Sequence, residues 1–164
     1  MMKYYVLIFF SLIISACSST KGHNNYRYGK KPQILQQPTL LRTDGVYLSE
    51  EEISGKKNYF FIRFYGNGRC YVSDMEVGNP SIDSLSTQNK RGEKTYFRNK
   101  TNEVSYEIWG GYNSGYMYIY YKLDSIGMES WGYKTRGMSS FEKYPRPTKY
   151  AFIPINFKTK EASW

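Results

Sequence analysis

The side chains that most often do chemistry in proteins are scarce in this sequence, which has one histidine, His23, and two cysteines, Cys17 and Cys70. A nucleophile activated for catalysis needs a positioned base, which is usually histidine. His23 lies in a polar segment without a hydrophobic period. Neither cysteine has a partner at the spacing that metal ligands require. We therefore expect no catalytic residue, no metal site and no cofactor, and we predict that the protein is not an enzyme.

The sequence also shows no clear carboxylate pair and no phosphate-binding loop. A glycosidase needs two carboxylates held several ångströms apart, and no spacing in the sequence pairs any two of the candidates, which are Asp74, Glu76, Glu107, Asp124 and Glu129. The acidic run at 50–52 has the ligands for a hard cation, although a solvated turn is the simpler interpretation. The glycine-rich segments 66–68 and 110–115 lack the lysine and the strand-to-helix context of phosphate loops, so they are predicted to be turns.

Cys17 follows a stretch with the parts of an export signal. Lys3 supplies a positive charge, residues 6–14 form an apolar run, and small residues precede the cysteine. The run is too short for a stable membrane helix. Two interpretations remain: an ordinary cleaved signal with a cysteine there by chance, or a signal that makes use of the cysteine.

The tetrapeptide at 14–17 (Ile-Ser-Ala-Cys) resembles the lipobox of bacterial lipoproteins. The resemblance implies that the signal peptide, residues 1–16, is removed and that Cys17 carries diacylglycerol and palmitate as the first mature residue. The membrane would then be a partner through the lipid anchor. Residues 18–21 lack an acidic run of the kind resembling surface-export signals, which favours a cell-envelope location in the outer membrane, facing the periplasm.

The formal net charge of +9 has two interpretations. It would attract anionic headgroups or polysaccharide, or it is simply a lysine-solvated surface. The expected compartment argues against nucleic acid as a partner. Cys70 would be the only thiol beside Cys17; we expect it to be a small buried hydrophobe, with an intermolecular disulfide as the alternative.

The composition and the hydrophobic pattern of the sequence divide the chain into segments. Residues 17–38 are polar, basic and interrupted by Pro and Gly, which predicts a flexible tether. Residues 39–155 carry short alternating apolar runs, which predicts one β domain with a single core. Residues 156–164 would be a C-terminal tail.

The run YFFIRFYGNGRCYVS at 59–73 predicts a hairpin and its register. A two-residue turn would pair residues of opposite faces, whereas a three-residue loop at 66–68 pairs Phe64 with Cys70 and Ile62 with Val72. Gly68 would then take the left-handed conformation of a G1 bulge.

Further strands are predicted by the same alternation. They lie at 45–48, 95–98, 104–108, 117–123, 129–133, 139–144 and 150–155, with 110–115 as a hairpin turn. A short helix is predicted at 79–85, with Asn79 as its N-cap. The expected fold is all-β, an antiparallel up-and-down barrel of about eight strands with one short helix.

The order of motifs also resembles a known family. Gly45-Val46-Tyr47, the hairpin with its Gly-Asn-Gly turn and a final Tyr-Ala-Phe strand at 150–152 are similar to the small lipocalin-like lipoproteins of Gram-negative bacteria, over about residues 43–153. Tyr47 stands where lipocalins proper carry tryptophan. The resemblance implies a lipid-anchored barrel with an apolar cavity.

The alternation assigns residues to two faces. The predicted interior, and hence the candidate ligand-binding set, comprises Phe60, Ile62, Phe64, Val72, Val104, Ile108, Met117 and Ile119. The opposite face would present Tyr116, Tyr118 and Tyr120, joined by Trp109 or with Trp109 at the barrel mouth. That tyrosine face is either an exposed surface for sugar rings or a protein partner, or a set of cross-strand pairs that stabilise the sheet.

Ser84 and Ser125 lie in Asp-Ser-aliphatic triplets that look like acceptors of general O-glycosylation systems in some Gram-negative envelopes. The expected function is non-enzymatic: a cell-envelope lipoprotein whose barrel binds a small apolar or amphipathic ligand. The alternative is a protein- or glycan-interaction module that uses the exposed tyrosine face.

Overall fold

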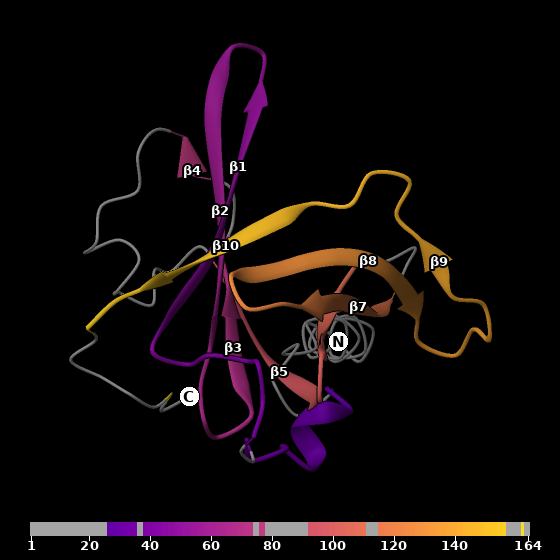
Figure 1. The fold of residues 1–164 in the computed structure, drawn as a ribbon. Helices are drawn as coiled ribbons and strands as arrows, with labels where there is room; N and C mark the ends of the chain where they lie inside the picture. The colour runs from indigo at the N-terminus through magenta and orange to yellow at the C-terminus, as the bar shows by residue number, and fades with distance from the viewer. Residues whose placement is uncertain are drawn as a thin grey trace, which may run out of the picture.

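The computed structural model describes residues 26–35, 38–73, 76–77, 92–110, 115–156 and 162. Eight antiparallel strands within this part of the chain close into an up-and-down barrel (Figure 1), in the order β1-β10-β8-β7-β6-β5-β3-β2, with β2 returning to β1. The strands are β1 (Gly45–Ile53), β2 (Lys56–Phe64), β3 (Arg69–Val72), β5 (Glu93–Lys100), β6 (Glu103–Trp109), β7 (Tyr116–Leu123), β8 (Gly127–Thr135) and β10 (Lys149–Pro154). The predicted all-β barrel is confirmed.

Two short strands lie outside the closed ring. They are β4 (Glu76–Val77), which pairs with β2, and β9 (Glu142–Lys143), which pairs with β8. Strand β9 covers only part of the strand predicted at 139–144. The helix predicted at 79–85 lies outside the described residues. The one helical element described is a 3-10 turn, η2 (Tyr28–Lys30), and no helix in the described part of the chain has the length and apolarity to cross a membrane.

The hairpin of β2 and β3 has the predicted register. Phe64 lies opposite Cys70 and Ile62 opposite Val72. The loop closes with hydrogen bonds from Tyr65 N to Arg69 O at 2.9 Å and from Gly68 N to Tyr65 O at 3.1 Å. Gly68 has φ +81°, which is the left-handed conformation that the three-residue loop requires.

The β1–β2 hairpin is longer than the predicted strand at 45–48 and projects beyond the barrel (Figure 1). Residues 51–57 at its tip are exposed. The acidic run at 50–52 therefore lies on a strand and not in a turn, and Glu50 forms a surface ion pair with Lys57 at 2.6 Å. Opposite charges placed across two strands support the arm electrostatically.

The barrel interior is filled by alternate residues of its strands. The fully buried rings include Phe64 and Phe97, whose centroids are 5.0 Å apart, and Tyr47, which lies 5.6 Å from Phe64. Cys70 is fully buried within the same core, as predicted. Rings that pack edge to face at these distances leave no room for a ligand in this part of the barrel.

The outer wall of β2 and β3 forms a second core, where Phe61, Tyr65 and Tyr71 pack with Val46. Ala162 from the chain end joins it, and its carbonyl accepts hydrogen bonds from Arg69 at 2.8 Å and Asn67 at 3.1 Å. The segment predicted as a free tail therefore places at least this residue on the barrel.

A third core lies on the outer wall of β5 and β7, beneath the N-terminal segment, which we define as residues 26–35. Tyr26 and Tyr28 of this segment are buried against Tyr96 and Tyr118. Leu35 N donates to the carbonyl of Gly66 at 3.0 Å, so the segment also contacts the β2–β3 turn. These residues were predicted as part of the flexible tether, and the structure instead packs them on the barrel.

Candidate functional site

One end of the barrel interior is hollow. A cavity of about 350 Å³ opens where β6 ends and β7 begins. Small-molecule sites commonly occupy about 300–1,000 Å³, so the cavity lies at the lower end of that range. Its lining comprises Tyr106, Ile108, Trp109, Gly110, Met117, Ile119, Tyr121, Ser130, Tyr144, Arg146, Thr148 and Tyr150.

Strand alternation explains which residues of β6 and β7 reach the cavity. Tyr106 lies opposite Ile119 and Ile108 opposite Met117 in the paired strands, so these four residues share the inner face. Where β7 pairs with β8, the register shifts by one residue, because Tyr120 lies opposite Gly132 and Tyr121 lies opposite Ser130. Met128 and Tyr133, which are an odd number of residues apart on β8, therefore both pack in the interior core, which a strict alternation would not allow.

Phenol hydroxyls form the polar part of the cavity. Tyr106 and Tyr121 stack with centroids 5.6 Å apart, and their hydroxyls lie 3.0 Å from each other. Tyr150 packs edge to face on Tyr121. Burial raises the pKa of Tyr106 and of Tyr121 well above the ordinary value for tyrosine. Both phenols therefore stay neutral at physiological pH and can donate or accept a hydrogen bond.

Apolar and cationic groups complete the lining. Ile108 and Met117 are half-buried and lie closer to solvent than Tyr121, of which only 2% is exposed. Arg146 is exposed at the opening. None of the described lining residues is a carboxylate, a histidine or a cysteine. The site can therefore hold an apolar body and a hydrogen-bonding or anionic end, while its lining offers no nucleophile–base pair.

The structure brings together part of the predicted ligand-binding set. Ile108, Met117 and Ile119 line the cavity. Ile62, Phe64, Val72 and Val104 belong instead to the packed part of the interior. Phe60 is half-buried and is not part of that core. The prediction identified the inner face but could not say which half of the barrel is filled.

Several lining residues were not predicted. Tyr106 and Tyr121 lie on the same inner face of β6 and β7 as the chosen residues, so the same pattern could have included them. Tyr144, Arg146 and Tyr150 come from a distant segment. Only the closure of the barrel, with β10 beside β8, brings that segment to the cavity. No local sequence pattern signals this closure.

The tyrosine face of β7, for which the sequence left open an exposed binding surface or a set of stabilising cross-strand pairs, is largely covered. Tyr118 is only 7% exposed because the ring of Tyr28 covers it, with centroids 5.0 Å apart. Tyr116 contacts Tyr26 at 5.2 Å and Trp109 at 4.9 Å. The three tyrosines do point outward from the sheet, but the N-terminal segment shields them, and Tyr116 and Tyr120 are half-buried. Trp109 joins this cluster and borders the cavity as well.

The remaining predicted sites are placed as follows. Ser125 is exposed in a turn where Asp124 accepts hydrogen bonds from the backbone of Ile126 and Gly127. Ser84 and Cys17 lie outside the described residues. The described part of the chain contains no cluster of three or more His, Cys, Asp or Glu residues that could hold a metal ion.

Comparison of the chain with protein-family models, with curated proteins and with solved structures yields no match.

Proposed function

We propose that this chain is a lipocalin-like, lipid-anchored cell-envelope protein that binds a small apolar or amphipathic molecule in the end cavity of its barrel, without catalysing a reaction. The cavity itself is the main support for this proposal, because the rest of the barrel interior is filled by packed side chains. An apolar body would lie against Ile108 and Met117. Its polar end would bind the neutral phenols of Tyr106 and Tyr121 or the guanidinium of Arg146.

The alternative function, recognition of a protein or glycan through an exposed tyrosine face, has weaker support. Tyr118 at the centre of that face is buried beneath the N-terminal segment. Stacking on a sugar ring needs an accessible aromatic face. We therefore favour the cavity over the tyrosine face as the binding site.

Ligand binding can be tested with cis-parinaric acid, a fluorescent amphipathic polyene. We expect saturable fluorescence enhancement with the full chain in detergent, and at least tenfold weaker binding by Ile108→Trp, whose larger ring fills the cavity. Met117→Trp is the second variant, in case the first does not fold. Lys122→Ala is the matched control, since Lys122 is exposed on the same strand and does not line the cavity. Absence of saturable binding, or equal binding by the filled variants, would overturn the proposal.

The lipid anchor needs its own experiment. Cells expressing the chain would be fed an alkyne analogue of palmitate, and the purified protein would be coupled to a fluorescent azide. We expect label on the wild type and none on Cys17→Ser. A Cys70→Ser variant is the control, because Cys70 is buried in the core. Label that survives Cys17→Ser would contradict anchoring at that residue.

A further inference from the structure

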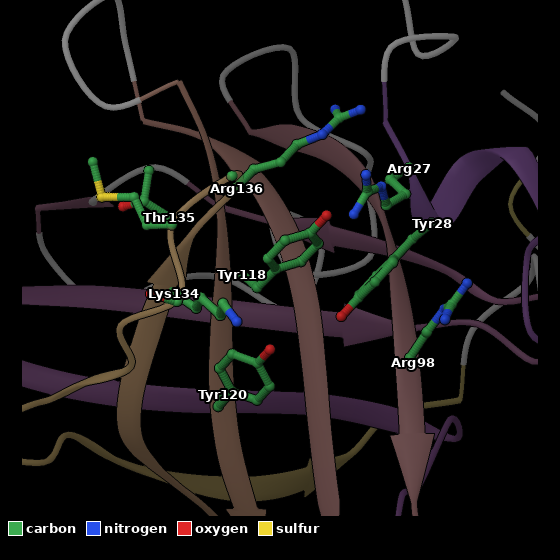
Figure 2. Close-up of a pocket in the computed structure, with 11 residues that line it drawn as sticks. Arg27, Tyr28, Arg98, Tyr118, Tyr120, Lys134, Thr135 and Arg136 are labelled. Carbon is green, nitrogen blue, oxygen red and sulfur yellow. The ribbon is translucent and has the colours of Figure 1, made fainter.

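A second hollow lies on the outer wall of the barrel and does not depend on the proposed function of the interior. Its volume is about 480 Å³. The N-terminal segment, β5, β7, the end of β8 and the turn after it line this hollow (Figure 2). We name it the basic pocket, and its lining comprises Arg27, Tyr28, Arg98, Tyr118, Tyr120, Lys134, Thr135, Arg136, Gly137, Met138 and Ser139.

Four cationic side chains line the basic pocket, and none of its described lining residues is acidic. Figure 2 shows Lys134 on one side, Arg27 and Arg98 on the other, and the tyrosine rings between them. Arg136 is partly neutralised, because its guanidinium lies 3.6 Å from the fully buried carboxylate of Glu107. The other three cations face one hollow, and like charges gathered in this way attract a polyvalent anion.

The N-terminal segment is fixed where it walls the pocket. The backbone N–H of Tyr28 donates to Glu107 at 2.9 Å, and the hydroxyl of Tyr28 lies 3.1 Å from that of Ser105. Arg98 lies over the ring of Tyr28, 4.7 Å from its centroid. The wall of the pocket is therefore fixed by contacts between the N-terminal segment and strands that lie far from it in the sequence.

Tyr118 supplies an observation that is independent of charge. It is more than nine-tenths buried, and its hydroxyl has no hydrogen-bond partner in the described part of the chain. Figure 2 shows this hydroxyl pointing into the space between Arg27 and Arg136. A buried hydroxyl without a partner is costly. An acceptor bound among the arginines would satisfy it.

We propose that the basic pocket binds a phosphomonoester. Such a group carries close to two negative charges at neutral pH and three strong acceptor oxygens. Guanidinium groups bind phosphate oxygens with geometric specificity, and the Tyr118 hydroxyl provides a neutral donor beside them. The pocket is larger than a phosphate, so the molecule that carries the phosphate has room beside the ring of Tyr120. Both a phosphorylated sugar and the headgroup of phosphatidic acid offer this chemistry.

Isothermal titration calorimetry on the full chain in dodecyl maltoside tests the proposal and separates the two sources. The probes are glucose 6-phosphate for the soluble source and dihexanoyl phosphatidic acid for the lipid source. Glucose and dihexanoyl phosphatidylcholine are the matched molecules without a phosphomonoester. We expect binding of at least one phosphomonoester and no binding of the matched molecules. The better of the two phosphomonoesters identifies the source.

Two variants tie the binding to the pocket. The double variant Arg27→Ala/Lys134→Ala removes two cations and leaves Arg136 on Glu107 and Arg98 on Tyr28, and we expect at least tenfold weaker binding. Tyr118→Phe removes only the hydroxyl, and we expect about tenfold weaker binding with the charge unchanged. The double variant Lys56→Ala/Lys149→Ala removes the same charge from exposed sites elsewhere and serves as the control.

The outcomes separate specific binding from general attraction to a basic protein. Loss of binding in the pocket variants, with the control unchanged, supports the proposal. Lack of binding to both phosphomonoesters, or equal weakening by the pocket and control variants, would overturn it. Ile108→Trp should leave phosphomonoester binding unchanged, so a failure here is independent of the interior cavity.

Discussion

Strand β7 separates two hollows of opposite character. Its residues Met117, Ile119 and Tyr121 face the end cavity, which has an apolar wall and neutral phenols. Tyr118 and Tyr120, which alternate with them, face the basic pocket. The inner hollow is bounded by the strands of the closed sheet and their connections. The outer hollow has as one of its walls a segment that precedes the barrel in the chain.

This difference shows how the two faces of one strand can line hollows of different polarity. Inside the barrel, burial by neighbouring strands excludes charged groups, apart from Arg146 at the opening. Outside, the same strand contributes aromatic rings, and charged residues of neighbouring elements surround them. The interior is therefore expected to resist removal of the N-terminal segment, whereas the basic pocket is not.

The largest effect on stability is expected from a void in the packed interior. Phe64→Ala should lower the free energy of unfolding by about 3–5 kcal/mol, because it leaves a void among the rings of Tyr47 and Phe97. Chemical denaturation followed by tryptophan fluorescence measures the loss. A loss below that of a variant in the N-terminal segment would contradict the view that the interior carries most of the stability.

Ionisation of buried tyrosines is expected to destabilise the barrel at high pH. Burial raises the pKa of Tyr47 from the ordinary 10.0 to about 12. Between these values the unfolded chain loses this proton more readily than the folded protein, so stability falls as the pH rises. The contribution of Tyr47 is complete below pH 10 and lost by about pH 12, and it amounts to roughly 2–3 kcal/mol.

The matched variant for this effect is Tyr47→Phe. Denaturation at about pH 9 and about pH 12 should show a smaller pH-dependent loss in the variant than in the wild type. Part of the wild-type loss will remain, because burial also raises the pKa of Tyr120, on the outer wall, to about 12. An unchanged pH dependence in Tyr47→Phe would contradict the assignment.

Tyr28→Ala tests the outer wall. We expect it to lower the free energy of unfolding by roughly 2 kcal/mol, since the ring packs on Tyr118 and beneath Arg98. Hydrogen exchange should become faster over residues 26–35 and remain slow in β2. Uniformly faster exchange over both regions would show that the segment is an integral part of the barrel.

Gly68→Ala gives the smallest expected effect and probes where the segment meets the barrel. An alanine at φ +81° is strained by about 1–2 kcal/mol. Its Cβ would also lie 2.5 Å from the carbonyl oxygen of Gln33 in the N-terminal segment. We expect a lower melting temperature and faster exchange near residue 33. Gly66→Ala is the control, because its Cβ would meet no atom within 4 Å.

The sequence predicts local geometry well where a single physical rule decides it. The register of the 59–73 hairpin follows from keeping Ile62 and Phe64 on one face, and the structure has that register. Strand alternation likewise identified Ile108, Met117 and Ile119, which line the cavity. It could not exclude Ile62 or Phe64, because the filling of a barrel depends on rings from several strands.

Long-range packing accounts for the rest. Glu107 alternates with buried residues and would be expected to face solvent, yet it is fully buried. It is covered by Tyr28, which lies 79 residues earlier in the chain. The segment around Tyr28 is polar and has no hydrophobic period, so its composition predicted a tether. Tyr26 and Tyr28 pack it on the wall, together with hydrogen bonds to distant residues, and no local pattern signals such contacts.

The packing of Tyr26 on the barrel also limits how far the barrel could lie from a membrane to which the chain is anchored. Eight residues lie between Cys17 and Tyr26, which makes nine Cα–Cα steps, and an extended chain advances at most about 3.6 Å per step. With lipid on Cys17, the outer wall at Tyr26 would thus lie within roughly 30 Å of the attachment point. A tether running to residue 38 would have permitted more than twice that distance. The barrel would then be held close to the bilayer, and the wall that carries the basic pocket would be the part nearest to the attachment point.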